Sequence, residues 1–113
     1  MRIDDIKPRP FRVVRASGDT AVLTVPTDML GYINDLEIDT RTLSGKTSTV
    51  TLDVRDTYTP QGGSSTTAVR KTIGVLAGDV IDVDLRAPLH VIGAVALRSS
   101  YSGPVVSMSV LLE

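Results

Sequence analysis

Residues 50–55 read Val50-Thr51-Leu52-Asp53-Val54-Arg55, with an apolar residue at every second position and a polar residue between. Side chains alternate between the two faces of a β-strand, so this stretch predicts a strand with one face in a core and the other in solvent. The same period recurs at residues 80–85 and 105–112. Short alternating runs, each closed by Gly, Pro, Asp or Ser, favour an all-β fold.

About eight strands are expected along the chain. They are residues 11–16, 20–25, 32–42, 47–58, 68–76, 80–85, 89–99 (interrupted at Gly93) and 105–112. The pattern predicts no helix long enough to cover a parallel sheet. An antiparallel β-sandwich, specifically a jelly roll, satisfies these observations because two alternating faces bury each other. An immunoglobulin-like sandwich is the alternative.

The length of 113 residues corresponds to one domain of ordinary size. The chain has no cysteine, which excludes disulfides and thiolate metal sites. Its apolar stretches are far shorter than the roughly 20 residues that cross a bilayer, and residues 1–5 lack the apolar segment of a secretory signal. We therefore expect a protein that is made and kept soluble, with no membrane partner.

The first fifteen residues are basic. They carry five Lys or Arg against two Asp, a net charge of +3, and since the whole chain is −1 the remainder is −4. Pro8 and Pro10 are incompatible with a central strand or a helix. We predict that residues 1–10 form an extended arm outside a single sandwich domain of residues 11–113. Such an arm is either an attachment segment for an acidic partner surface or a frayed terminus with scattered charges.

Nucleic acid is not an expected partner. The basic residues are few and the body of the chain is acidic, so a strong phosphate-binding surface is not predicted. Phe11 is the one aromatic residue among them, and a single ring is a poor platform for stacking bases.

An acidic stripe lies along the third expected strand. The residues predicted to share its face are Ile33, Asp35, Glu37, Asp39 and Arg41, with Asn34, Leu36, Ile38 and Thr40 on the opposite face. Neighbouring carboxylates on one face are about 6–7 Å apart along the strand, whereas Ca²⁺ needs about six to eight converging oxygens. We predict a solvated face and no metal site. The pair Asp82 and Asp84 is interpreted in the same way.

The sequence offers no catalytic motif. His90 is the single histidine, and although Ser99, Ser100 and Asp84 are suitable by type, a nucleophile needs a base and an orienting group within reach. Gly62-Gly63 lies in a Ser/Thr-rich loop and has no following Lys, unlike a phosphate-binding loop. We predict no enzyme activity and no cofactor, with His90 as a packing or surface residue.

Carbohydrate binding is the alternative function, because sandwich folds serve as lectins and adhesins. Such sites stack sugars on exposed aromatic rings. Tyr58 and Tyr101 are the candidates, on the condition that the fold brings them to one end of the sandwich.

Several strand-and-turn segments together suggest a family. They are Val22-Leu23-Thr24-Val25-Pro26, Ser48-Thr49-Val50-Thr51-Leu52, Leu76-Ala77-Gly78-Asp79-Val80-Ile81-Asp82-Val83-Asp84-Leu85, Pro88-Leu89-His90-Val91-Ile92-Gly93 and Val105-Val106-Ser107-Met108-Ser109-Val110. Their order over residues 20–113 resembles small β-sandwich virion proteins of tailed bacteriophages, namely head decoration or capsid-stabilising proteins and related fibre-associated modules. The resemblance carries over no catalytic residue.

This resemblance implies a protein made in the host cytoplasm that binds the outer surface of a phage capsid. Its implied partner is the lattice of the major capsid protein, and its implied assembly is a homotrimer. A tail or fibre module of the same fold is the alternative within the family. The arm supplies the candidate partner-binding residues, with charged side chains steering and apolar ones anchoring. These residues are Arg2, Ile3, Ile6, Lys7, Arg9, Phe11 and Arg12.

Overall fold

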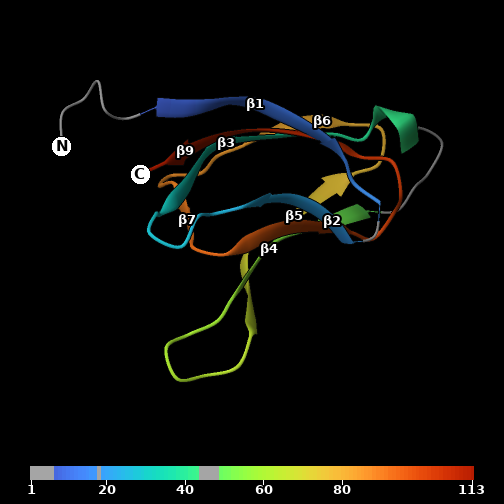
Figure 1. Ribbon diagram of the computed structural model, residues 1–113. Helices are drawn as coiled ribbons and strands as arrows, with labels where there is room; N and C mark the ends of the chain where they lie inside the picture. The colour runs from blue at the N-terminus through green and yellow to red at the C-terminus, as the bar shows by residue number, and fades with distance from the viewer. Residues whose placement is uncertain (1–6, 18, 44–48) are drawn as a thin grey trace.

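The computed structural model describes residues 7–17, 19–43 and 49–113, with the backbone alone for residues 7–13. Within these ranges, nine strands form two antiparallel sheets packed face to face (Figure 1). The first sheet contains β1 (Lys7–Arg15), β3 (Gly31–Asp39), β6 (Val80–Val83), β7 (Leu89–Val91) and β9 (Val105–Leu112). The second contains β2 (Asp19–Thr24), β4 (Thr49–Tyr58), β5 (Thr66–Leu76) and β8 (Ala94–Ser99). A short 3-10 helix, η2 (Arg41–Leu43), follows β3.

The strand order is that of a jelly roll. In the first sheet the order is β1-β9-β3-β6, and β7 also pairs with β3; in the second it is β2-β8-β4-β5. Because β6 and β7 pair with successive segments of β3, residues 36–39 and 31–33, they act as one interrupted strand. Counted in this way there are eight strands in two four-stranded sheets. The predicted jelly roll is confirmed over the immunoglobulin-like alternative.

The core lies between the two sheets and follows the predicted alternation. In β4, Val50, Leu52 and Val54 are fully buried while the residues between them are exposed or half-buried. In β9 the buried positions are again every second residue. Apolar area removed from water contributes roughly 25 cal/mol per Å², so these inner faces supply the main stabilising term.

The first strand begins earlier than the sequence predicts. β1 starts at Lys7, so residues 7–10 of the expected arm pair with β9. β1 is an edge strand, which agrees with the prediction that Pro8 and Pro10 exclude a central position. Of the candidate partner-binding residues, Lys7, Arg9, Phe11 and Arg12 belong to β1, while Arg2, Ile3 and Ile6 lie outside the described residues.

Two predicted face assignments are wrong. Ile33 was expected on the side of the acidic stripe, but it is fully buried. Asn34 was expected on the face of Leu36 and Ile38, but it is exposed. The pairing of β3 with β9 shifts by one residue between Ile33 and Asp35, which is the signature of a β-bulge. The bulge turns Ile33 inward while Asp35 and Glu37 stay exposed. The prediction also ran the strand to residue 42, whereas β3 ends at Asp39 and η2 follows.

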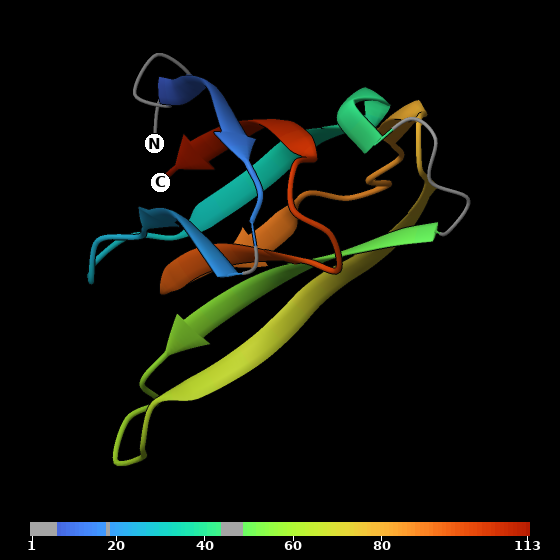
Figure 2. The same ribbon diagram turned by 90° about the vertical axis from the view of Figure 1, so that its right-hand side faces the viewer.

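The sandwich has two distinct ends, which we name for what they contain. At the hairpin end lie residues 25–30, residues 92–93 and the loop between β4 and β5, which projects beyond the rest of the molecule (Figures 1 and 2). At the turn end lie residues 40–43, 77–79 and 100–104. This separation decides which predicted site residues can act together.

Candidate functional site

A shallow groove of about 530 Å³ lies at the hairpin end. It is lined by Thr24, Val25, Thr27, Met29 and Leu30, by the end of β4 and by the turn between β7 and β8, and none of these lining residues is charged. The exposed Asp28 lies in the same turn as Met29 but outside the lining. Met29, Leu30, Tyr58 and Ile92 provide its larger apolar surfaces. Leu30 and Ile92 are 45% and 42% exposed, a large fraction for such side chains. The groove thus brings two exposed apolar side chains together in one uncharged concavity.

Backbone hydrogen bonds to Glu113 hold one wall of this groove, which consists of residues 26–30. Residues 26–29 turn after Pro26, whose carbonyl accepts a hydrogen bond from Met29 N at 3.0 Å. Leu30 N donates to Glu113 O, and Glu113 N donates to Leu30 O, both at 2.8 Å. The backbone of Leu30 is therefore fixed while its side chain is free to contact a partner.

Glycine is required in the opposite wall. A Cβ atom on Gly93 would lie 2.1 Å from the carbonyl oxygen of Thr57, far inside van der Waals contact. The turn between β7 and β8 thus lies directly against the end of β4. Gly93 O also accepts a hydrogen bond from Val25 N at 3.0 Å, which connects this wall to the first.

Behind the groove lies the buried carboxylate of Asp56. Its side chain is fully buried, and Oδ2 accepts hydrogen bonds from Arg70 Nη2 at 2.9 Å and Ile92 N at 2.9 Å. Oδ1 accepts one from Gly93 N at 2.8 Å. The Arg70 guanidinium lies 5.5 Å from the centre of the Tyr58 ring, within cation-π range. A charge that is buried in this way needs these partners to offset its lost hydration.

A bulge in β5 provides Arg70. Val54 pairs with Lys71 and the next residue, Arg55, pairs with Val69, which leaves Arg70 as the extra residue. Bulges of this kind redirect a side chain. The Arg70 side chain accordingly reaches Asp56, which follows Val50, Leu52 and Val54 on the inward face of β4.

The start of β1 lies at the same end of the sandwich as the groove. Lys7 pairs with Leu112, and Leu112 pairs with Gly31, the residue after Leu30. The basic N-terminal segment therefore joins the sheet two strands away from the groove wall. Lys7, the first described residue of the predicted attachment segment, therefore lies at the hairpin end.

The acidic stripe forms a separate feature on the outer face of the first sheet. Asp35 and Glu37 line a shallow groove of about 470 Å³ together with Asp82, which pairs directly with Glu37 across the strands. These carboxylates and Asp84 are exposed, as predicted. Among the residues that the structure describes, no three acidic or histidine side chains are arranged to hold a metal ion.

The candidate catalytic types do not come together. His90 is exposed, and its ring meets the edge of Tyr32 with centres 4.7 Å apart, so it is a surface and packing residue as predicted. Ser99 lies at the turn end and donates its hydroxyl hydrogen to Tyr101 O at 2.6 Å. Among the described residues, no helix has the length and apolar character that would span a bilayer.

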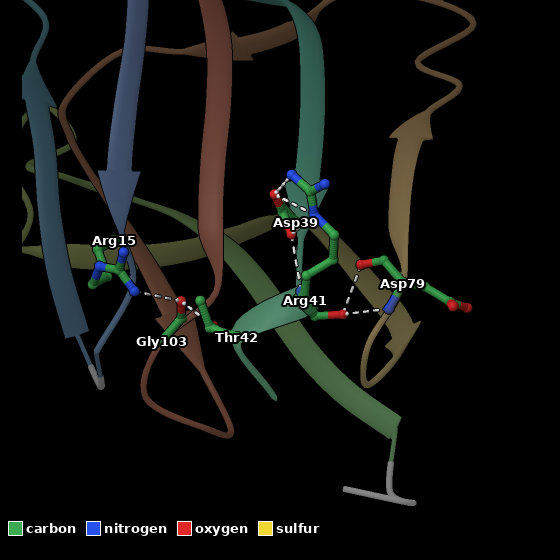
Figure 3. A network of polar contacts seen from close by, with 7 residues as sticks. Arg15, Asp39, Arg41, Thr42, Asp79 and Gly103 are labelled. Atoms are coloured by element: carbon green, nitrogen blue, oxygen red, sulfur yellow. Dashed lines mark hydrogen bonds and ion pairs between the residues drawn. The ribbon is translucent and has the colours of Figure 1, made fainter. Parts of the chain in front are cut away.

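The turn end is held by polar contacts (Figure 3). Thr40 is fully buried, and its hydroxyl lies 2.8 Å from Asp79 O and accepts a hydrogen bond from Asp79 N at 3.0 Å. Arg41 donates to Asp39, and these hydrogen bonds hold the pKa of Asp39 below its ordinary value. Thr42 Oγ1 donates to Gly103 O at 3.0 Å.

The two tyrosines considered for a sugar site are far apart. Tyr58 ends β4 at the hairpin end, where Arg70 lies against its ring. Tyr101 follows β8 at the turn end. The condition for that site, convergence of the two rings, is not met.

The sequence interpretation missed Leu30, Ile92 and Asp56. A signal for Asp56 was present, since it continues the inward series of alternate residues in β4. Leu30 and Ile92 carried no such signal, because each lies just outside a strand and their proximity depends on how β3 and β7 pair. Comparison of the chain with models of protein families and with curated protein sequences finds no match.

Proposed function

We propose that this protein is a non-enzymatic structural component of a virion that binds the outer surface of a phage capsid and stabilises it. The observation that carries the proposal is the uncharged hairpin-end groove, with exposed Leu30 and Ile92, beside the start of β1. Apolar anchors next to a basic segment form an interface in which charge speeds encounter and burial provides affinity.

The lattice of the major capsid protein is the proposed partner, and a homotrimer is the proposed assembly. A trimer can be held on the lattice by contacts that are individually weak. Once one subunit is bound, the other two meet the lattice at a high effective concentration. This choice of partner follows from the resemblance of the sequence segments in residues 20–113 to small virion proteins of tailed bacteriophages. Light scattering after size-exclusion chromatography measures the mass in solution and so tests the trimer directly. A strict monomer would contradict a trimer in solution, and trimers could then form only on the capsid surface.

The groove is tested by co-sedimentation with expanded heads of the phage that encodes the chain, prepared without this protein. The variant Leu30→Asn with Ile92→Asn should lose most of its binding, because both anchors become polar. Val69→Asn is the matched control, since Val69 is 52% exposed but lies outside the groove lining. Wild-type binding by the double variant contradicts the proposal.

The N-terminal segment needs a separate test. Deletion should stop at residue 6, because residues 7–10 pair with β9 and their loss would disturb the sheet. The truncated protein should keep its melting temperature and bind heads more weakly. Binding to purified tails or fibres in place of heads would instead indicate the tail or fibre module.

A further inference from the structure

Asp56 connects the two segments that form the Gly93 side of the hairpin-end groove, without lining the groove itself. One segment is Thr57 and Tyr58 at the end of β4, and the other is Ile92 and Gly93. Asp56 directly precedes the first segment along β4, and its carboxylate accepts hydrogen bonds from the backbone N–H groups of both residues in the second.

Arg70 completes this connection from a third strand. It donates to Asp56 Oδ2 through Nε at 3.2 Å and Nη2 at 2.9 Å, and its guanidinium lies against the Tyr58 ring. Arg70 thus contacts both the Tyr58 ring and the buried carboxylate of Asp56. The Asp56–Arg70 ion pair therefore contacts the Tyr58 ring through Arg70 and the backbone of Ile92 through Asp56.

We propose that Asp56 and Arg70 are positioning residues that hold the groove in the shape required to bind an uncharged, apolar side chain on an extended segment of the capsid protein. This inference rests on the proposed function. The absence of charge in the lining favours an uncharged occupant, since an ionised group there would lose hydration without an opposite charge. The threonine hydroxyls at the rim, including Thr27 and Thr59, suit the backbone of an extended segment.

Stability alone is a weak reason for such a pair. Replacement of a buried ion pair by apolar residues of similar volume is often neutral or stabilising. Apolar residues would not, however, bond the two N–H groups of the turn at Ile92 and Gly93. A groove held rigid before binding loses less conformational entropy when its partner arrives, which raises affinity.

The test compares Asp56→Asn and Arg70→Met with Thr40→Val, which removes a buried polar tie at the turn end. Binding to expanded heads is measured well below the melting temperatures of all three variants. The first two should weaken binding by about tenfold or more, and Thr40→Val should leave it unchanged. Arg70→Lys keeps the charge and should recover part of the binding. Equal losses in all three variants would overturn the proposal, because they would report destabilisation alone.

Amide hydrogen exchange provides a readout that needs no capsid. In Asp56→Asn at least one of the amides of Ile92 and Gly93 should exchange much faster, because the two N–H groups bond different carboxylate oxygens and the Asn side chain keeps only one acceptor oxygen, while Thr40→Val should leave both amides protected. Unchanged protection in Asp56→Asn would overturn the positioning role whatever the binding result. If wild-type protein fails to bind heads while the exchange result holds, the proposed function is wrong and the structural part of the inference stands.

Discussion

Each end of the sandwich has a polar side chain with no exposed surface that ties a loop to a strand, Thr40 at the turn end and Asp56 at the hairpin end, and these two ties differ in charge. At the turn end, the neutral hydroxyl of Thr40 bonds the backbone of Gly78 and Asp79. At the hairpin end, the Asp56 carboxylate bonds Arg70 and the backbone of Ile92 and Gly93. Both close a loop against a strand, but only the second also stands behind an apolar groove.

The difference in charge suggests a difference in role. Thr40 only closes a turn, whereas Asp56 also lies beside the proposed binding groove. A hydroxyl can close a turn at small desolvation cost, as Thr40 does. A carboxylate in the same situation needs a cation, and here Arg70 also orders the Tyr58 ring at the groove. The charged arrangement occurs at the end that contains the proposed binding groove.

The largest expected effect comes from Asp56→Ala. It leaves the N–H groups of Ile92 and Gly93 without their acceptor, whereas the Arg70 guanidinium, on a side chain that is 31% exposed, can be hydrated, so the free energy of unfolding should fall by about 3–4 kcal/mol. Urea denaturation measures the loss. Asp53→Ala on the same strand is the control, since Asp53 is partly exposed and its contact with Arg55 spans 3.7 Å, and it should cost far less. Similar losses in both variants would remove the distinction between the ties.

Gly93→Ala should be the next most damaging change. The added Cβ would overlap the Thr57 carbonyl oxygen, so the turn must move away from β4 at a cost of about 2–3 kcal/mol. Thermal unfolding checks this expectation. Gly74→Ala is the matched control, because its Cβ would meet the Thr49 side chain at 3.3 Å and that methyl group can move. A stable Gly93→Ala protein would show that the turn is not fixed against β4.

Thr40→Val should cost about 1 kcal/mol, because the hydroxyl bonds to Gly78 and Asp79 are lost while the N–H groups of both residues keep second acceptors in Thr40 O and Leu76 O. Thr40→Ser retains the hydroxyl and should recover most of the stability. Denaturation of the two variants side by side gives the comparison. A loss in Thr40→Val as large as that in Asp56→Ala would mean that charge makes no difference between the ends.

The smallest effect should come from Asp39→Asn and should depend on pH. The folded pKa of Asp39 is lowered, first by the Arg41 side-chain hydrogen bond and then by the Arg41 backbone. Its contribution is therefore present above the unfolded pKa of about 3.8 and is lost as the pH falls through the lower folded value. Melting curves of the variant and wild type should differ slightly at neutral pH and converge in strong acid. Asp35→Asn, at an exposed residue of the same strand, is the control.

The sequence by itself determined the all-β class, the inward series in β4 and β9, and the exclusion of Pro8 and Pro10 from a central strand. These properties are local, because a period of two and the missing proline N–H act within a few residues. Even the exact bounds of β9 follow from its alternation. The position of Thr40 on the same face as Leu36 and Ile38 was predicted for the same reason, and its burial agrees.

Tertiary structure alone decided the strand order, the bulges and the groove. The bulge that turns Ile33 inward depends on pairing with β9, more than seventy residues away along the chain, and the one that redirects Arg70 depends on its pairing with β4. Leu30 and Ile92 become neighbours because β7 pairs with β3. The free energies that select such contacts come from packing and pairing between distant segments, so a local pattern cannot report them.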